Sequence, residues 1–201
     1  MRNVNRNFVI AAVAMVAVLL LIGGTSAQSP LGPGTNGTKD KPVHIQGQAM
    51  GQAQQMGQTF GVNLIIEEYS TVDDQKALLE AFTAKGNEGL VNALSKMSTK
   101  GRMAITGTLG YDVTYIKAFA QPDGGTKLRM VTNRPIRFGE AWSDSRSMDY
   151  NLSGVELILT ADGKKNSGTL FPACQFKMDK ENQIQLELLQ NAFKLVDVRI
   201  R

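Results

Sequence analysis

Residues 111–133 read YDVTYIKAFAQPDGGTKLRMVTN, and this stretch decides the fold class of the chain. In its first half, Tyr111, Val113, Tyr115 and Phe119 alternate with smaller or polar residues, as expected for a strand with one buried face. The QPDGG sequence that follows predicts a tight turn, because proline presets φ and glycine readily adopts positive φ. Residues 126–133 then form a second candidate strand, so the stretch predicts an antiparallel hairpin.

The flanking sequence extends this pattern in both directions. Further strands are expected at 62–69, 103–109, 152–160, 169–178, 183–189 and 193–200. Two short runs with helical spacing lie between 70 and 100, separated by KGNEG at 85–89, and they predict an αα-hairpin between the first and second strands. Short turns join only antiparallel neighbours. We therefore expect an α+β fold, mostly antiparallel β, in which about eight strands form a curved sheet, barrel or sandwich.

The N-terminal part of the chain predicts export. Residues 1–27 combine Arg2 and Arg6, an apolar run from Phe8 to Ile22 and a small-residue segment ending at Ala27, which are the three parts of a secretory signal peptide. The apolar run is shorter than the roughly 20 residues that span a bilayer. We expect cleavage after Ala27, a periplasmic or extracellular location and no stable membrane insertion afterwards; an uncleaved anchor is the alternative.

The remaining chain is expected to hold a linker and one domain. Residues 28–60 are rich in Gly and Gln and poor in large aliphatic side chains, so they are expected to form a flexible linker. Residues 61–201 are expected to form a single β-rich domain. The formal charge of the whole chain is +4, and its acids and bases are interspersed rather than gathered in a basic stripe. This pattern argues against nucleic acid as a partner.

Two residue types that dominate enzyme sites occur only once each. Cys174 lies in the apolar sequence LFPACQF, which predicts a small buried side chain; a reactive thiol or an intermolecular bridge is the alternative. His44 falls in the expected linker. A Ser-His-Asp triad or a zinc site of His and Cys is therefore improbable. We assign no catalytic residue, no metal and no cofactor.

The candidate ligand site lies in residues 134–150, RPIRFGEAWSDSRSMDY, the longest stretch without a regular period. Long aperiodic loops in compact domains are either functional or disordered. Guanidinium groups beside an aromatic side chain suit a planar or anionic group. We predict a binding site formed by Arg134, Arg137, Trp142 and Arg146. The alternative is that Trp142 covers the core while the arginines pair with acidic residues of the same stretch.

Four stretches show a resemblance to an uncharacterised family of small exported bacterial proteins. They are GTLGYDVTY at 107–115, PDGG at 122–125, NRPIRFGEAW at 133–142 and MDYNLSGVELILTADGKKNSG at 148–168. The resemblance covers roughly residues 62–200. It implies an exported bacterial protein on the envelope side, and it supplies no activity, ligand or catalytic residue.

Three functions from different classes are compatible with the sequence. The first is a non-enzymatic binding module for an apolar or amphipathic small molecule, which an enclosed apolar cavity of several hundred Å³ would favour. The second is a secreted carboxylate-dependent hydrolase acting on glycans, which two acids facing one cleft would favour. The third is a structural or interaction protein of the cell envelope, which a filled core would favour. Whether any reaction is catalysed and the oligomeric state both stay open.

Overall fold

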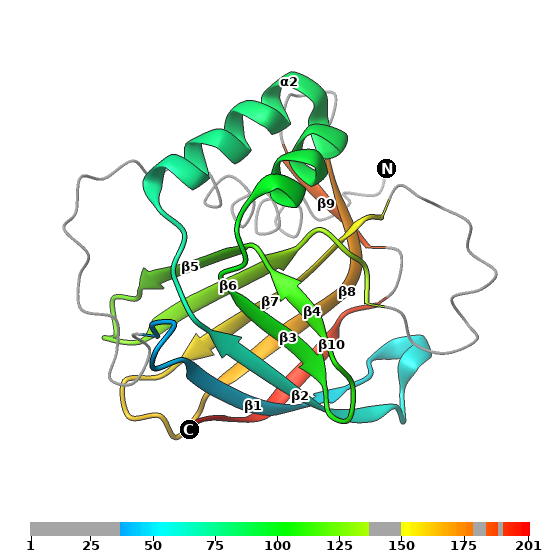
Figure 1. Cartoon of the computed structure of the whole chain (residues 1–201). Helices are drawn as coiled ribbons and strands as arrows, with labels where there is room; N and C mark the ends of the chain where they lie inside the picture. The colour runs from blue at the N-terminus through cyan, green and yellow to red at the C-terminus, as the bar shows by residue number, and fades with distance from the viewer. Residues whose placement is uncertain (1–36, 137–149, 179–183, 189–190) are drawn as a thin grey trace, which may run out of the picture.

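The structure, a computed structural model, describes residues 37–136, 150–178, 184–188 and 191–201. Ten strands, one 3₁₀ helix and one α-helix follow one another in this part of the chain (Figure 1). They are β1 (Val43–Met50), η1 (Ala53–Gln55), β2 (Thr59–Ile66), α2 (Val72–Lys96), β3 (Gly101–Ile105), β4 (Tyr111–Val113), β5 (Tyr115–Ala120), β6 (Thr126–Thr132), β7 (Leu152–Leu159), β8 (Ser167–Met178), β9 (Ile184–Leu188) and β10 (Phe193–Ile200).

All ten strands belong to one antiparallel sheet. Its order is β4-β3-β2-β1-β10-β8-β7-β6-β5, and β9 pairs with the distal half of β8. The expected hairpin of β5 and β6 is present, with Ala120 opposite Thr126 and Tyr115 opposite Val131. The expectation of a mostly antiparallel, curved sheet is therefore confirmed.

The two ends of this strand order come together, so the sheet is nearly closed and barrel-like. β4 and β5 are separated only by Thr114, and they pair with β3 and β6 respectively. The Thr114 backbone N–H donates to the Val131 carbonyl at 3.3 Å. Ser70, in the segment that follows β2, reaches β5 through two hydrogen bonds with the Ile116 backbone, at 2.8 and 3.0 Å.

The interior of the barrel-like sheet is filled by apolar side chains. Inward positions alternate along each strand, as they must on a pleated sheet. The buried cluster comprises Val43, Ile45, Ala49, Val62, Leu64, Ile66, Met103, Val113, Ile116, Leu128, Met130, Ile136, Val155, Leu157, Leu159, Leu170, Phe193, Leu195 and Val198. This cluster forms the main core.

The helix α2 packs on the outer face of the sheet. Its buried residues Leu78, Phe82, Leu90 and Leu94 form a second cluster with outward side chains of the strands, Tyr115 among them. The helix is interrupted at Lys85 and at Gly86, where φ is 58° and ψ is −142°, and Figure 1 shows the chain turning back there. The two helical segments of α2 on either side of this break agree with the predicted pair of helices joined by KGNEG.

Strand β1 corrects the expected domain boundary. Its eight residues lie between β2 and β10, in the middle of the sheet order, so the interpretation of residues 28–60 as a linker is wrong for β1 and for the start of β2. The error has a physical cause, because two inward positions of β1 hold Gly47 and Ala49, which add little apolar surface to the pattern. No helix in the described ranges is long and apolar enough to cross a membrane.

Candidate functional site

The structure describes only one of the four residues predicted to bind a ligand. Arg134 is exposed just after β6, and its carbonyl accepts a hydrogen bond from the Ser153 hydroxyl at 2.6 Å. Arg137, Trp142 and Arg146 lie outside the described residues. The site built on Trp142 therefore stays a prediction.

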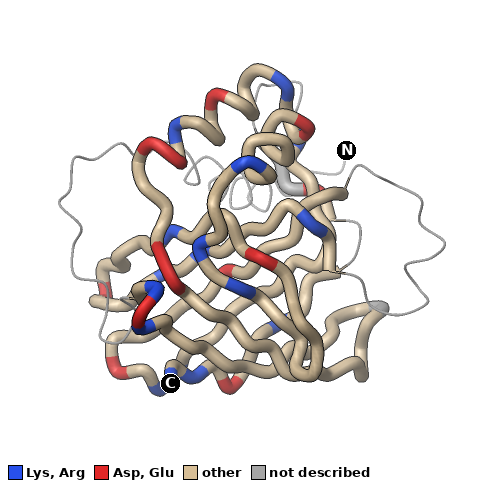
Figure 2. The backbone as a smooth tube through the Cα atoms, in the orientation of Figure 1, with Lys and Arg blue, Asp and Glu red and all other residues tan. Residues whose placement is uncertain are grey.

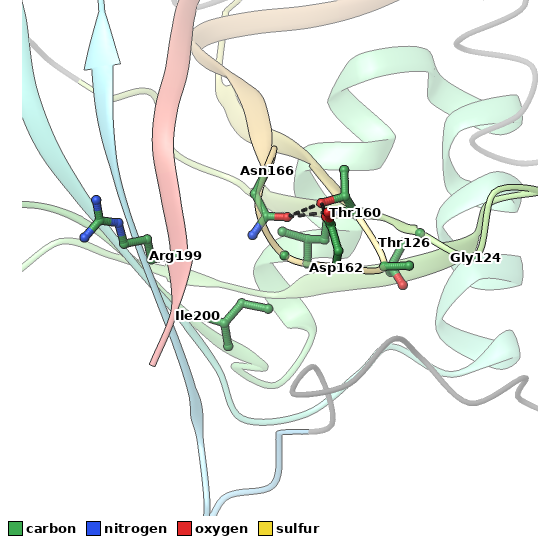
Figure 3. A pocket seen from close by; sticks show the side chains of 11 residues that line it. Gly124, Thr126, Thr160, Asp162, Asn166, Arg199 and Ile200 are labelled. Carbon is green, nitrogen blue, oxygen red and sulfur yellow. Dashed lines mark hydrogen bonds between the residues drawn. The ribbon is translucent and has the colours of Figure 1, made fainter.

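A pocket of about 430 Å³ lies at one end of the barrel-like sheet (Figure 3). Three segments that are far apart in the sequence form it: the turn between β5 and β6, the turn between β7 and β8, and the end of β10. The lining residues are Gly124, Gly125, Thr126, Leu159, Thr160, Ala161, Asp162, Gly163, Asn166, Arg199 and Ile200. Both turns are predicted from the sequence, but their proximity in space is not.

The first wall of the pocket is the predicted QPDGG turn. The Gln121 N–H donates to the Gly125 carbonyl at 2.9 Å, and the Gly124 N–H donates back to the Gln121 carbonyl at 3.0 Å. Gly124 has a φ of 80°, a conformation that side chains rarely adopt. The carboxylate of Asp123 accepts from the Gly125 N–H at 3.0 Å, which fixes the last residue before β6.

The second wall is the turn at residues 160–166, which is tied together by side-chain oxygens. Asp162 Oδ1 accepts from the Thr160 hydroxyl at 2.9 Å and from the Lys164 N–H at 3.1 Å. Asn166 accepts from the Thr160 N–H at 2.9 Å and donates to the Val198 carbonyl on β10 at 3.2 Å. The turn is thereby held against β10, and the pocket is preformed.

The floor of the pocket is apolar, and its edge carries hydrogen-bond acceptors. Leu159 and Ile200 supply the apolar surface. The Lys164 N–H, followed by the Thr160 hydroxyl, lowers the pKa of the Asp162 carboxyl, so this side chain is anionic at neutral pH. Arg199 precedes Ile200 on β10, and its side chain extends to the opposite side of the strand (Figure 3). The lining therefore includes one residue of each charge, with the carboxylate of Asp162 on the turn and Arg199 on β10.

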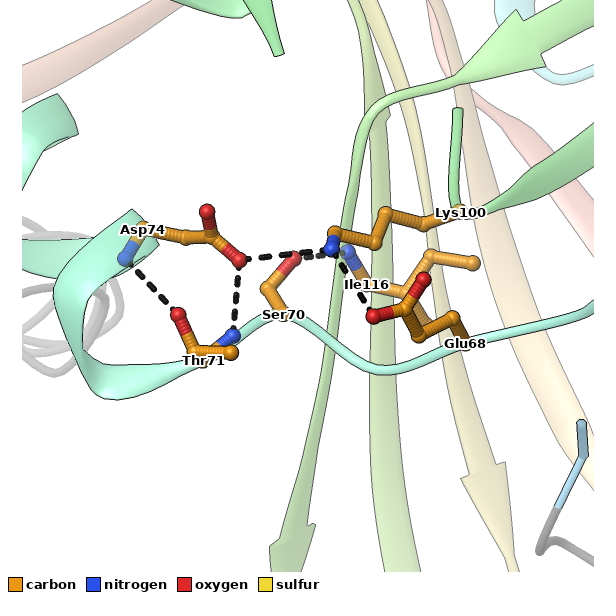
Figure 4. Close-up of polar contacts among 6 residues, drawn as sticks. All are labelled: Glu68, Ser70, Thr71, Asp74, Lys100 and Ile116. Carbon is orange, nitrogen blue, oxygen red and sulfur yellow. Dashed lines mark hydrogen bonds and ion pairs between the residues drawn. The ribbon is translucent and has the colours of Figure 1, made fainter. Parts of the chain in front are cut away.

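A second polar cluster surrounds Lys100, whose side chain is only 6% exposed (Figure 4). Its Nζ lies 3.3 Å from Oε1 of Glu68, which follows β2, and 3.5 Å from Oδ2 of Asp74, in the first turn of α2. Asp74 also closes a capping box with Thr71: the Thr71 N–H donates to Oδ2 at 2.8 Å, and the Asp74 N–H donates to the Thr71 hydroxyl at 3.1 Å.

The Lys100 cluster has a structural explanation. The Lys100 carbonyl accepts from the N–H groups of Glu67 and Glu68, each at 2.9 Å, while its own N–H donates to the Val113 carbonyl at 2.8 Å. The residue thus joins the exit of β2, the start of α2 and β4. Both carboxylates compensate the charge of the buried ammonium. Glu68 and Asp74 therefore do not form an acid–base pair that faces a substrate cleft.

The chain's single cysteine and single histidine both lie in the described residues. Cys174 is buried, which confirms the expected small buried side chain, and burial raises the pKa of its thiol to about 12. A thiol of this kind is a poor nucleophile at neutral pH. His44 is exposed on β1, and its carbonyl accepts from the Arg201 N–H at 2.8 Å.

Neither metal-binding geometry nor a known relative adds to this picture. Within the described residues, no three or more His, Cys, Asp or Glu side chains gather in a group that could hold a metal ion. No protein-family model matches the chain, and no match to it was found among curated proteins or solved structures.

Proposed function

We propose that the protein is an exported, non-enzymatic binding module that holds a small amphipathic molecule at the end of its barrel-like sheet. The observation that carries this proposal is the pocket of about 430 Å³ between the two turns and β10. Small-molecule sites typically have volumes of about 300–1,000 Å³ and are often found in the mouths of β-barrels. The proposed location outside the cytoplasm rests on the signal-peptide pattern of residues 1–27.

The filled interior determines where such a ligand can bind. Leu128, Met130, Leu157 and Leu170 are fully buried in the main core, and a ligand among them would have to displace close-packed side chains. We therefore propose a ligand in the pocket between the turns rather than in the interior. This differs from the enclosed apolar cavity that would have favoured a carrier.

The lining of the pocket suggests the chemistry of the ligand. An apolar part would contact Leu159 and Ile200, and a hydroxyl or amine group would donate to the carboxylate of Asp162. Charge-assisted hydrogen bonds to a carboxylate are about twice as strong as neutral ones. A small amphipathic amine or alcohol therefore suits the Asp162 side of the pocket.

A pocket-filling variant tests this proposal. Ala161 is exposed and lines the pocket, so Ala161→Phe places a bulky ring there without disturbing the core. Ala77→Phe, at an exposed position on α2, is the matched control. The exported proteins are purified and denatured, and the released small molecules are identified by mass spectrometry. The melting temperatures of the three proteins are also measured with a panel of amphipathic amines and alcohols.

The wild type and Ala77→Phe should release the same small molecule or share the same thermal shift, because a ligand that binds only the folded state stabilises it. Ala161→Phe should lose both responses. Equal responses from all three proteins would contradict the proposal, as would no response from any of them.

The filled interior favours a second candidate, a structural or interaction protein of the cell envelope. A sheet whose core is packed throughout needs no small ligand for its stability. If neither extraction nor the panel reveals a ligand, this candidate takes the place of the binding module.

A further inference from the structure

Two hairpin turns project from the end of the sheet opposite the pocket. They are residues 51–58, between β1 and β2, and residues 106–110, between β3 and β4. They lie side by side because β2 pairs with β3. The Thr106 N–H donates to the Gly61 carbonyl at 2.9 Å, and the Asn63 amide donates to the Thr106 hydroxyl at 3.2 Å. We call the two turns and the adjoining Met50 the hairpin end.

The hairpin end carries most of the exposed large apolar side chains in the described residues. Met50 is 46% exposed, Met56 80% and Leu109 87%. Val72 and Leu188 are the two other exposed side chains of this kind, and they lie on α2 and β9. Single exposed apolar residues need no explanation, but Met56 and Leu109 on adjacent turns, with Met50 at the end of β1 beside them, form a local feature.

The two turns themselves carry no charged residue, and the nearest charges are at their bases. Arg102 Nη1 donates to the Leu109 carbonyl at 3.2 Å while its guanidinium pairs with Asp112 at 3.1 Å, and Lys194 on β10 lies opposite Met50. No Asp, Glu, Lys or Arg occurs between Gly47 and Ile66 or between Met103 and Tyr111. At the chain average of 20% charged residues, stretches of this length would carry several. Figure 2 shows the contrast, since the tubes of the β1–β2 and β3–β4 turns are free of blue and red while the C-terminal end of the molecule carries both. The exposed amides of Gln52 and Gln58 supply the polar groups instead.

We propose that the hairpin end docks reversibly on a lipid bilayer surface of low net charge. Apolar side chains on convex turns can enter the acyl boundary, and neutral amides can hydrogen-bond at the headgroup level. Because Arg102 at the base of the second turn is neutralised by Asp112, the contact of the turns needs no anionic lipid. A single myristoyl chain binds a membrane with a partition constant of only about 10⁴ M⁻¹. We expect the membrane affinity of three apolar side chains to be similarly weak and the binding to be reversible.

The size and shape of the hairpin end favour a bilayer over a protein partner. A specific protein interface buries about 800 Å² on each side and has complementary shape. Two apolar side chains on narrow turns and a third beside them present less surface than that. A bilayer adapts to a convex tip, so a small contact is sufficient there.

Peroxide oxidation of the methionines provides a local test. The exported chain is treated with peroxide, with and without phosphatidylcholine vesicles, and the oxidation of each methionine is followed by peptide mass spectrometry. Oxidation follows exposure, so vesicles should slow the oxidation of Met56 by at least about fivefold. Met97, at the far end of α2, should oxidise at an unchanged rate. An unchanged rate at Met56 would overturn the proposal.

Vesicle sedimentation of variants gives a second, independent test. Met56→Gln combined with Leu109→Gln should weaken binding to phosphatidylcholine vesicles by at least about tenfold, because two apolar side chains are removed from the contact. Val72→Gln makes the same kind of change at an exposed site on α2 and should leave binding unaltered. Raising the salt concentration should change binding little, since the turns carry no charge of their own and Arg102 beside them is paired with Asp112.

Three results would overturn the proposal. One is equal binding by the wild type and the double variant. Another is a strong loss of binding at high salt, which would indicate an ionic contact elsewhere on the surface. The third is self-association of the wild type, abolished by Met56→Gln with Leu109→Gln and indifferent to vesicles, which would identify the hairpin end as an interface between copies of this chain.

Discussion

Lys100 places an ammonium group below the surface, between the carboxylates of Glu68 and Asp74. Lys100→Met keeps the apolar stem but removes the charge, so the two carboxylates lose their partner. Breaking a buried pair costs about 3–5 kcal/mol. Both carboxylates are partly exposed and can be hydrated, so we expect a smaller loss in the free energy of unfolding, about 1–3 kcal/mol.

Chemical denaturation measures the effect of Lys100→Met, and Lys76→Met is its control. Lys76 pairs with Glu80 at 3.9 Å on the exposed side of α2, and such pairs contribute less than about 0.5 kcal/mol. Similar stability losses in the two variants would contradict the structural role given to the Lys100 cluster.

Tyr115 illustrates a buried polar group without a partner. Its hydroxyl neither donates nor accepts a hydrogen bond in the described part of the chain. Leaving a buried polar group unsatisfied in this way costs about 1–3 kcal/mol of stability. Tyr115→Phe should therefore leave the free energy of unfolding at pH 7 unchanged or raise it by about 1 kcal/mol. A loss of more than this amount would reveal a hydrogen bond that the hydroxyl makes in solution.

The pH dependence of the Tyr115→Phe variant gives a further check. Burial raises the pKa of Tyr115 to about 12, although the nearby Arg129 opposes the shift. The unfolded chain loses this proton near its ordinary pKa of about 10, so the wild type should lose stability as pH rises from 10 to 12. Cys174 contributes a loss of the same sign to both proteins. The variant should therefore show the shallower decline in denaturation experiments at alkaline pH.

At the scale of elements, β1 is the segment on which sequence and structure differ most. Its backbone pairs with β2 on one side and β10 on the other, so its amides should exchange as slowly as those of β7. Hydrogen exchange with mass spectrometry can compare peptides covering 43–50 and 152–159, with the turn at 106–110 as a fast-exchanging control. Rapid exchange throughout 43–50 would restore the linker interpretation.

The contrast between β1 and the other strands explains how far sequence reasoning reaches. Strands such as β6 and β10 carry large side chains inward, and their predicted ranges agree with the structure to within a few residues. In β1, a Cβ on Gly47 would lie 3.2 Å from Val198 Cγ2, so the close approach of β10 favours glycine there. Because tight packing favours a glycine at this inward position, β1 lacks the alternation of large apolar residues from which strands are predicted.

At the scale of the whole molecule, the candidate site depends on contacts between distant parts of the chain. The PDGG and DGKKNSG sequences predict turns, and the structure has turns at both places. Only the sheet order brings these turns to one end of the sheet beside Ile200, and sequence alone does not specify that order. The pocket therefore could not be predicted, although each of its local elements could.

The most direct test of the central claim is to locate a bound ligand by methyl and amide NMR. Titration with an amphipathic amine or alcohol that raises the melting temperature should shift the signals of Leu159, Ala161, Asp162 and Ile200 at the pocket. The methyl groups of the interior residues Leu128 and Met130 should keep their positions. Shifts confined to the interior methyl groups, or spread evenly over the molecule, would contradict binding at the end of the sheet.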